Sequence, residues 1–187
     1  DIGVKRVVYI VETDKGTNDS GALDALKTLF ATKTKDFVTA VDEKNVIIVK
    51  EVKPNESSDD IYHVGETILD MLETEAMIQA HVSFGTVVNE IKDVSKSYKE
   101  AKMALEVGKI FYEDRNIIAY NRLGIGRLIY QLPLPLCKMF IKEIFTSISP
   151  DEFDEETLTT INKFFENNLN VSETSRQLYI HRNTLVY

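Results

Sequence analysis

The chain has 187 residues, 43% of them hydrophobic, which is enough to bury the core of one large domain or two small ones. No apolar run reaches the roughly 20 residues that a membrane-spanning helix needs, so we expect a globular chain in a reducing cytoplasm, with its one cysteine, Cys137, as a buried structural thiol. The net charge of −8 excludes a protein that coats nucleic acid through bulk electrostatics, and any DNA contact must be local.

The first two predicted elements are a strand and a helix. Residues 7–11 form an unbroken β-branched and aromatic run, which indicates a strand buried on both faces at the centre of a sheet. After a loop over 13–20, apolar residues recur on one side of a helix that Asp19 or Ser20 would cap. These apolar residues are Leu23, Leu26, Leu29 and Phe30.

A hairpin and a second helix follow. The apolar runs 37–41 and 46–49, separated by the polar tetrad 42–45, predict two paired strands. Helical spacing then recurs, with Asp59 or Asp60 as the candidate cap. The residues at this spacing are Ile61, Val64, Ile68, Leu69 and Leu72.

The sheet is completed by two more strands around a third helix. Residues 77–84 and 117–120 read as strands, and the helix between them is expected to end near Gly108. Its apolar positions are Val94, Tyr98, Ala101 and Leu105. The order β-α-β-β-α-β-α-β predicts one antiparallel or mixed sheet with helices on a face, related to the ferredoxin-like split βαβ arrangement.

A change of pattern marks a boundary between two domains. Gly124-Ile125-Gly126 reads as a flexible linker turn, and beyond it the periodicity is purely helical. Pro133 and Pro135 favour a break that gives an α/β domain over 1–131 and an all-α domain over 132–187. Two amphipathic helices are expected at the start of the second domain. The Met and Phe residues from Met139 to Phe145, in the first of these helices, are expected in the core of the domain or, as the alternative, in a dimer interface. The apolar residues of the two helices are Leu136, Met139, Phe140, Ile144 and Phe145, then Leu158, Ile161, Phe164, Phe165 and Leu169.

The last 18 residues parse as a short helix, a tight turn and a second helix. Ser172 is the expected cap of the first helix, and the small Thr174 and Ser175 would let the two helices approach closely. An apolar seam is expected inside, formed by Leu178, Ile180 and Leu185. The polar residues outside the seam give this segment its functional interest.

Those polar residues have the chemistry of a helix-turn-helix, whose second helix enters the major groove of DNA. Arg182 can bond a guanine edge or a phosphate, and Asn183 can pair with adenine or cap the turn. Thr184 and His181 can hold the DNA backbone. The candidate DNA-binding residues are Ser172, Arg176, His181, Arg182, Asn183, Thr184 and Tyr187. A surface helical hairpin with incidental polar residues is the alternative.

The segment from Asn170 to Tyr187 resembles the C-terminal signature of the PucR/CdaR-type transcription regulators, which respond to purine-breakdown or sugar-diacid metabolites. That signature reads approximately N-V-S-x-A-A-x-x-L-x-x-H-x-N-T-L-x-Y-R-L. Thr174 and Ser175 replace its paired alanines, and the chain stops at Tyr187, before its final arginine and leucine. The resemblance therefore implies a recognition helix cut short, and little or no DNA binding by this chain alone.

The same resemblance extends upstream, because such regulators carry a middle domain distantly similar to the GGDEF diguanylate cyclases. Residues 97–105 look like the helix of that domain. A working cyclase needs glycines and metal-holding carboxylates in its hairpin. Here Asp42 and Glu43 remain, but Val41 and Lys44 replace a glycine and the aromatic, so we expect a degenerate domain with no catalytic residues.

Other chemistry has little support in the sequence. His63, His81 and His181 fall on three separate predicted elements, without the spacing of a metal site. No phosphate-binding loop is present, and Gly124-Ile125-Gly126 lacks the third glycine of a dinucleotide site. We therefore expect no cofactor and no bound metal.

The sequence favours a cytoplasmic, sequence-specific DNA-binding regulator. The resemblance implies an N-terminal sensor, outside this chain, that binds a small-molecule effector, and helix-turn-helix proteins act as dimers on double-stranded operators. One alternative is a degenerate nucleotide-binding or cyclase-like signalling domain with a helical interaction tail. Another is a signalling adaptor whose tail binds protein.

Overall fold

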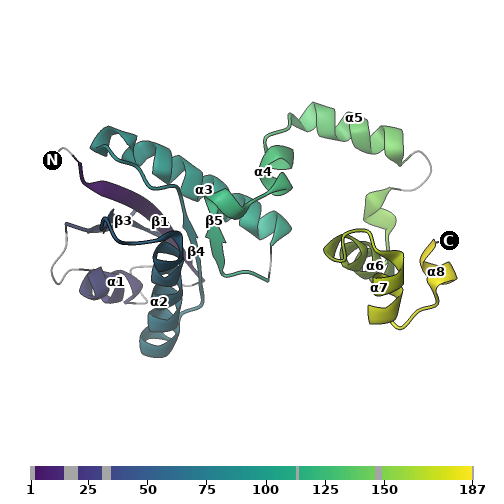
Figure 1. Cartoon of the computed structure of the whole chain (residues 1–187), viewed down its shortest axis with the longest axis horizontal. Helices are drawn as coiled ribbons and strands as arrows, with labels where there is room; N and C mark the ends of the chain where they lie inside the picture. The colour runs from purple at the N-terminus through teal and green to yellow at the C-terminus, as the bar shows by residue number, and fades with distance from the viewer. Residues whose placement is uncertain (1–2, 15–20, 31–34, 113, 146–148, 187) are drawn as a thin grey trace. The chain divides into compact units, whose positions relative to one another are not determined.

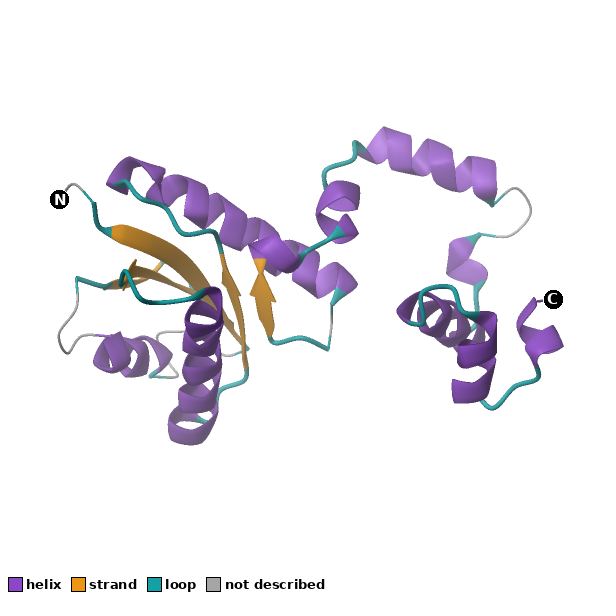
Figure 2. Cartoon of the chain, viewed as in Figure 1, coloured by secondary structure: helices purple, strands orange, loops and turns teal. Residues whose placement is uncertain are grey.

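The structure is a computed structural model that describes residues 3–14, 21–30, 35–112, 114–145 and 149–186 of the chain. It comprises two compact units, residues 1–131 and 132–187. Figure 1 labels the elements along the chain and Figure 2 separates helices from strands. The strands are β1 (Lys5–Thr13), β2 (Phe37–Ala40), β3 (Asn45–Val52), β4 (Ala80–Phe84) and β5 (Ile117–Ala119). The α-helices are α1 (Ala22–Phe30), α2 (Ser58–Ala76), α3 (Val94–Phe111), α4 (Ile125–Tyr130), α5 (Leu134–Ile144), α6 (Glu155–Glu166), α7 (Val171–Gln177) and α8 (Arg182–Val186). Short 3-10 turns lie at Ile91–Asp93, Tyr120–Arg122 and Pro150–Glu152.

The first unit is built on a mixed five-stranded sheet in the order β2-β3-β1-β4-β5. Strand β1 is central, as predicted, and its side chains from Val7 to Val11 are all buried. The predicted hairpin is confirmed as antiparallel β2 and β3, with Phe37 opposite Val49. Among the strands that the structure describes, only β4 and β5 pair in parallel, which accommodates α3 as the connection between them.

Helices cover both faces of this sheet, so the prediction of helices on a single face is wrong (Figure 1). Helices α1 and α2 pack Leu26 and Leu72 against the face that carries Tyr9. Helix α3 packs Ala101 and Leu105 against Ile10 on the opposite face. A central strand that is apolar at every position needs cover on both sides, which explains the arrangement.

Helix α3 contacts the sheet through the predicted Ala101 and Leu105 and also through small buried residues that the apolar pattern did not include. Ser97 is fully buried, and its Oγ accepts a hydrogen bond from the Val8 amide at 3.0 Å. Gly108 lies inside the helix, not at its end, because the helix continues to Phe111. A Cβ at Gly108 would lie 2.6 Å from Ile118 Cγ1, so only glycine fits this contact.

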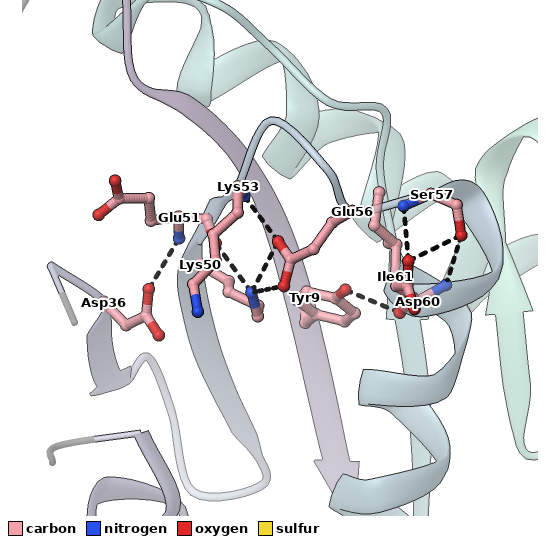
Figure 3. Close-up of polar contacts among 9 residues, drawn as sticks. All are labelled: Tyr9, Asp36, Lys50, Glu51, Lys53, Glu56, Ser57, Asp60 and Ile61. Carbon is pink, nitrogen blue, oxygen red and sulfur yellow. Dashed lines mark hydrogen bonds and ion pairs between the residues drawn. The ribbon is translucent and has the colours of Figure 1, made fainter. Parts of the chain in front are cut away.

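Helix α2 begins with a capping box that differs by residue from the predicted cap. Ser57 is the N-cap, its hydroxyl accepts from the Asp60 amide, and the Asp60 carboxylate accepts from the Ser57 amide (Figure 3). Asp60 is therefore the reciprocal partner rather than the cap. At the other end Met77 has a left-handed φ of 52°, so β4 begins at Ala80 and not at Met77. The caps expected at Asp19 or Ser20 fall outside the described residues.

The segment predicted as a flexible linker turn is the start of a helix. Gly124, with φ of 54°, precedes α4, and Gly126 lies inside that helix. A Cβ on Gly126 would meet Val107 and Phe111 of α3 at 3.2–3.3 Å, so α4 packs closely on α3. Gly126 thus serves close packing in the first unit and Gly124 supplies the positive φ before the helix, so the linker interpretation is wrong.

The second unit buries very little of its own surface. Thr174 and Ser175 are its only buried residues among those that the structure describes. The side chains of α5 that were expected in a core are exposed, with Phe140 at 60%, and Cys137 is half-buried rather than buried. Helix α6 ends at Glu166, so the predicted Leu169 lies beyond it.

None of the helices in the described ranges is both long and apolar enough to cross a membrane.

Candidate nucleic-acid interface

Helices α7 and α8, joined by a four-residue turn, form the helix-turn-helix that the sequence predicted. The N-cap of α7 is Asn170, whose side chain accepts a hydrogen bond from the Glu173 amide at 3.1 Å. Ser172, the expected cap, lies inside the helix with its side chain exposed. The helix starts earlier because asparagine is at least as good a cap as serine.

We expect Asn170→Ala to destabilise α7 by about 1 kcal/mol, because the Glu173 amide would lose its acceptor. Native-state hydrogen exchange of the α7 amides measures this change. Ser172→Ala is the matched control, since an exposed serine inside a helix gives up nothing when alanine replaces it. Equal effects from both changes would contradict the assignment of the cap.

The two small residues of α7 are its buried face. Thr174 and Ser175 are 0% and 6% exposed. Their hydroxyls donate to the carbonyls of Asn170 and Val171, each at 2.8 Å. Because each buried hydroxyl has a hydrogen-bond acceptor in its own helix, burying it leaves no donor unpaired. Threonine and serine can therefore occupy positions where alanines are usual in the signature.

A chain of polar contacts ties α7 to the end of α6. The side-chain amide of Asn167 donates, through Nδ2, to Thr174 Oγ1 at 3.3 Å and to Gln177 Oε1 at 3.1 Å. Gln177 in turn donates to the Glu173 carboxylate, which also receives two hydrogen bonds from Arg176. The Arg176 guanidinium and then Gln177 hold the pKa of Glu173 below its usual range. Arg176 is exposed, as predicted, but its guanidinium is already paired with the Glu173 carboxylate.

The turn positions the second helix through two features. Tyr179 has a left-handed φ of 56°, and the amides of Tyr179 and Ile180 donate to the carbonyls of Arg176 and Ser175. The His181 ring then caps α8, because its Nδ1 accepts from the Asn183 amide at 3.2 Å. A neutral ring whose Nδ1 accepts carries its proton on Nε2, which leaves a donor for an outside group.

The polar face of α8 is exposed. Arg182, Asn183 and Thr184 all present exposed side chains, and these make no hydrogen bond or ion pair with any residue in the described ranges. The apolar seam of Leu178, Ile180 and Leu185 is half-buried beneath them. Tyr187, the last candidate, lies outside the described residues. The structure thus brings His181, Arg182, Asn183 and Thr184 together and places Ser172 and Arg176 on the preceding helix.

A second candidate is a cavity of about 570 Å³ in the first unit. It lies beside α1, α2 and the end of β3, and three lysines and three acidic residues line it: Lys35, Lys50, Lys53, Asp36, Glu51 and Glu56. Figure 3 shows that Glu56 accepts hydrogen bonds from the Lys50 ammonium and the Lys53 amide. The most buried ammonium of the cavity is that of Lys50, and Glu56 already neutralises it. The cavity therefore does not have the excess positive charge that an anionic nucleotide needs.

The buried tyrosine of β1, Tyr9, lies near the same acidic residues. The Tyr9 hydroxyl donates to the Ile61 carbonyl of α2 at 2.8 Å (Figure 3). Burial, with Glu56 and Asp36 nearby, raises the pKa of Tyr9. The contact joins the central strand to α2, and this is a structural role.

The carboxylate of the β2–β3 turn is used within the turn itself. Asp42 accepts hydrogen bonds from the Lys44 and Asn45 amides, each at 2.8 Å, and from the Asn45 side chain. These bonds lower the pKa of Asp42. The three histidines lie on α2, on β4 and just before α8, and across the described residues no three His, Cys, Asp or Glu side chains are grouped to hold a metal ion.

Comparisons with known proteins match two separate parts of the chain. Residues 1–107 match the GGDEF-like domain family and residues 157–187 match the PucR C-terminal helix-turn-helix domain. The chain is 28% identical over 126 residues to the purine catabolism regulatory protein of Bacillus subtilis (strain 168), covering 65% of this chain and 24% of that protein. It is 26% identical to the DNA-binding transcriptional activator AdeR of the same organism, covering 81% of this chain and 37% of the activator. It is 23% identical to the carbohydrate diacid regulator of Escherichia coli (strain K12), covering 100% of this chain and 51% of the regulator. The chain thus spans about a quarter to a half of the length of these relatives.

Proposed function

Because this chain belongs to the PucR/CdaR family of regulators, with a GGDEF-like domain ahead of a PucR-type helix-turn-helix, we propose that it is part of a sequence-specific, DNA-binding transcription regulator of the cytoplasm. The observation that carries the proposal is the exposed polar face of α8, which follows a tight turn in a helix-turn-helix.

The proposed DNA-binding residues have separate roles. Arg182 and Asn183 contact base edges in the major groove, where a guanidinium reads guanine and a carboxamide reads adenine. Thr184 and the Nε2 of His181 donate to phosphates. Ser172 and Arg176, which lie on α7, and Tyr187 complete the proposed set. The first unit is a non-enzymatic scaffold, in which Asp42 holds its own turn.

We also propose that the regulator binds a small-molecule effector through a sensor domain outside this chain. The relatives are named for purine catabolism and for carbohydrate diacids, which makes metabolites of these classes the first candidates. Binding of the effector would change how the helix-turn-helix units are oriented toward the operator.

A homodimer follows from the same function, because helix-turn-helix proteins read two half-sites about one turn of DNA apart. The surface for the second copy is the apolar side of α5, where Met139, Phe140 and Ile144 are each more than half exposed. A unit that buries so little by itself needs such a partner.

We expect Phe140→Glu to convert the complete protein from dimer to monomer at micromolar concentration, since a charge at the centre of an apolar interface must be desolvated. Sedimentation velocity measures the change. Lys142→Glu, a charge reversal on the same helix, is the control and should remain dimeric. A Phe140→Glu protein that still dimerises would assign self-association to another surface.

The function is tested by selecting DNA from a random-sequence library with the complete protein. We expect one enriched motif with two half-sites, bound less tightly as the salt concentration rises. Calorimetry with GTP and Mg²⁺ tests the degenerate nucleotide-binding alternative. Binding of GTP without any enriched DNA would overturn the proposal, and an adaptor would enrich no motif and bind no nucleotide.

A further inference from the structure

Tyr179 occupies a position that the fold itself reserves for glycine. The Ile180 amide donates to the Ser175 carbonyl, and the Tyr179 amide donates to the Arg176 carbonyl. These two bonds define the glycine-type ending of a helix, in which the residue at Tyr179 is left-handed. Its φ is 56°, a region that a residue with a Cβ enters at a cost.

The tyrosine side chain does not contribute to packing that would offset this cost. It is 97% exposed, and its hydroxyl makes no hydrogen bond with any residue of the described ranges. Its neighbours Leu178 and Ile180 are half-buried and line a pocket against the start of α6. The ring therefore extends away from the unit, just before the recognition helix.

Exposure and a left-handed backbone do not by themselves indicate a function. Met77, at the end of α2, combines a φ of 52° with 81% exposure. What distinguishes Tyr179 is its place in the helix-turn-helix, three residues before Arg182, together with a hydroxyl that can donate a hydrogen bond.

The charge of the second unit adds an independent argument. Residues 132–187 carry five lysines and arginines against eight aspartates and glutamates, so cations for DNA phosphates are scarce. After Asn170 the basic residues are Arg176 and Arg182, and Glu173 already engages Arg176. Within this segment neutral donors can therefore add to the phosphate contacts, and the tyrosine hydroxyl is such a donor.

We propose that Tyr179 binds the DNA backbone, with its phenol hydroxyl donating a hydrogen bond to a phosphate at the edge of the groove that α8 reads. This inference rests on the proposed function and adds to it a contact that carries no base information. The left-handed turn residue is then kept as tyrosine for the bound state, although glycine would suit the free protein better.

The test uses the complete protein and two duplexes of equal length, the motif recovered by selection and an unrelated sequence. Tyr179→Phe keeps the ring and the backbone strain and removes only the hydroxyl. We expect it to bind both duplexes about three- to tenfold more weakly, by fluorescence anisotropy, with an unchanged melting temperature. The salt dependence should also be unchanged, because a phenol releases no counterion.

Tyr179→Gly should lose the same affinity while its melting temperature rises by about 2–6 °C, since strain is relieved. Met77→Gly is the matched control, with a raised melting temperature and unchanged DNA binding. If Tyr179→Phe binds both duplexes as tightly as the wild type, this inference is overturned and the proposed function stands. If the wild type binds neither duplex, both fail together.

Discussion

Replacing Gly85 with alanine is expected to lower the free energy of unfolding of the first unit by about 3 kcal/mol or more. The added Cβ would lie 2.1 Å from the Ser97 backbone oxygen and 2.8 Å from Ser97 Oγ. A backbone oxygen can move only if α3 moves, and that would break the hydrogen bond from the Val8 amide to Ser97. Urea denaturation followed by circular dichroism measures the loss.

Gly126→Ala is the matched control for this prediction. Its Cβ would approach the side chains of Val107 and Phe111 at 3.2–3.3 Å, and side chains can shift where backbone cannot. Alanine also favours a helix interior by about 0.5–1 kcal/mol over glycine, so we expect a net change near zero. A Gly85→Ala protein as stable as the Gly126→Ala protein would show that α3 does not lie so close to β4.

The strand order of the first unit could be predicted in part because its signal is local. The all-apolar run of β1 identifies a central strand, and the polar turn between two β-branched runs identifies the hairpin. Which faces the helices cover is a different question, since it depends on contacts between elements distant in sequence. The same apolar run, read for both of its faces, already implied cover on each side.

The helix boundaries were predicted less well because glycine has more than one use. Gly108 and Gly126 were read as breaks in the chain, yet both lie inside helices where another element leaves no room for a Cβ. Nothing in the local sequence distinguishes a glycine that ends a helix from one that allows close packing. The neighbours Ile118 and Val107 make that distinction, and they are known only from the fold.

The exposed face of the helix-turn-helix could be predicted from periodicity, whereas its internal bonding could not. The spacing of Leu178, Ile180 and Leu185 sets which side chains point outward. The cap at Asn170 had a signal in its spacing to Glu173, although Ser172 was preferred. The left-handed backbone at Tyr179 had none, because glycine or asparagine is the usual residue there.

The largest expected effect on DNA binding is that of Arg182→Ala in the complete protein. We expect operator affinity to fall by about 1–3 kcal/mol, a factor of roughly 5 to 150, because a forked donor to a base edge would be lost. The side chain is exposed and bonds to no other described residue, so the change should leave the melting temperature of the protein unaltered. Titrations of the operator and an unrelated duplex by fluorescence anisotropy measure affinity and specificity together.

Arg176→Ala separates base reading from general attraction. Arg176 lies on α7 and is engaged by Glu173, so its removal should weaken both duplexes alike and by less than the loss of Arg182. Arg182→Ala should weaken the operator more than the unrelated duplex, since only base contacts distinguish sequences. If the two variants lower both affinities equally, Arg182 contacts phosphate, and the reading of bases falls to Asn183 and to residues further along the recognition helix.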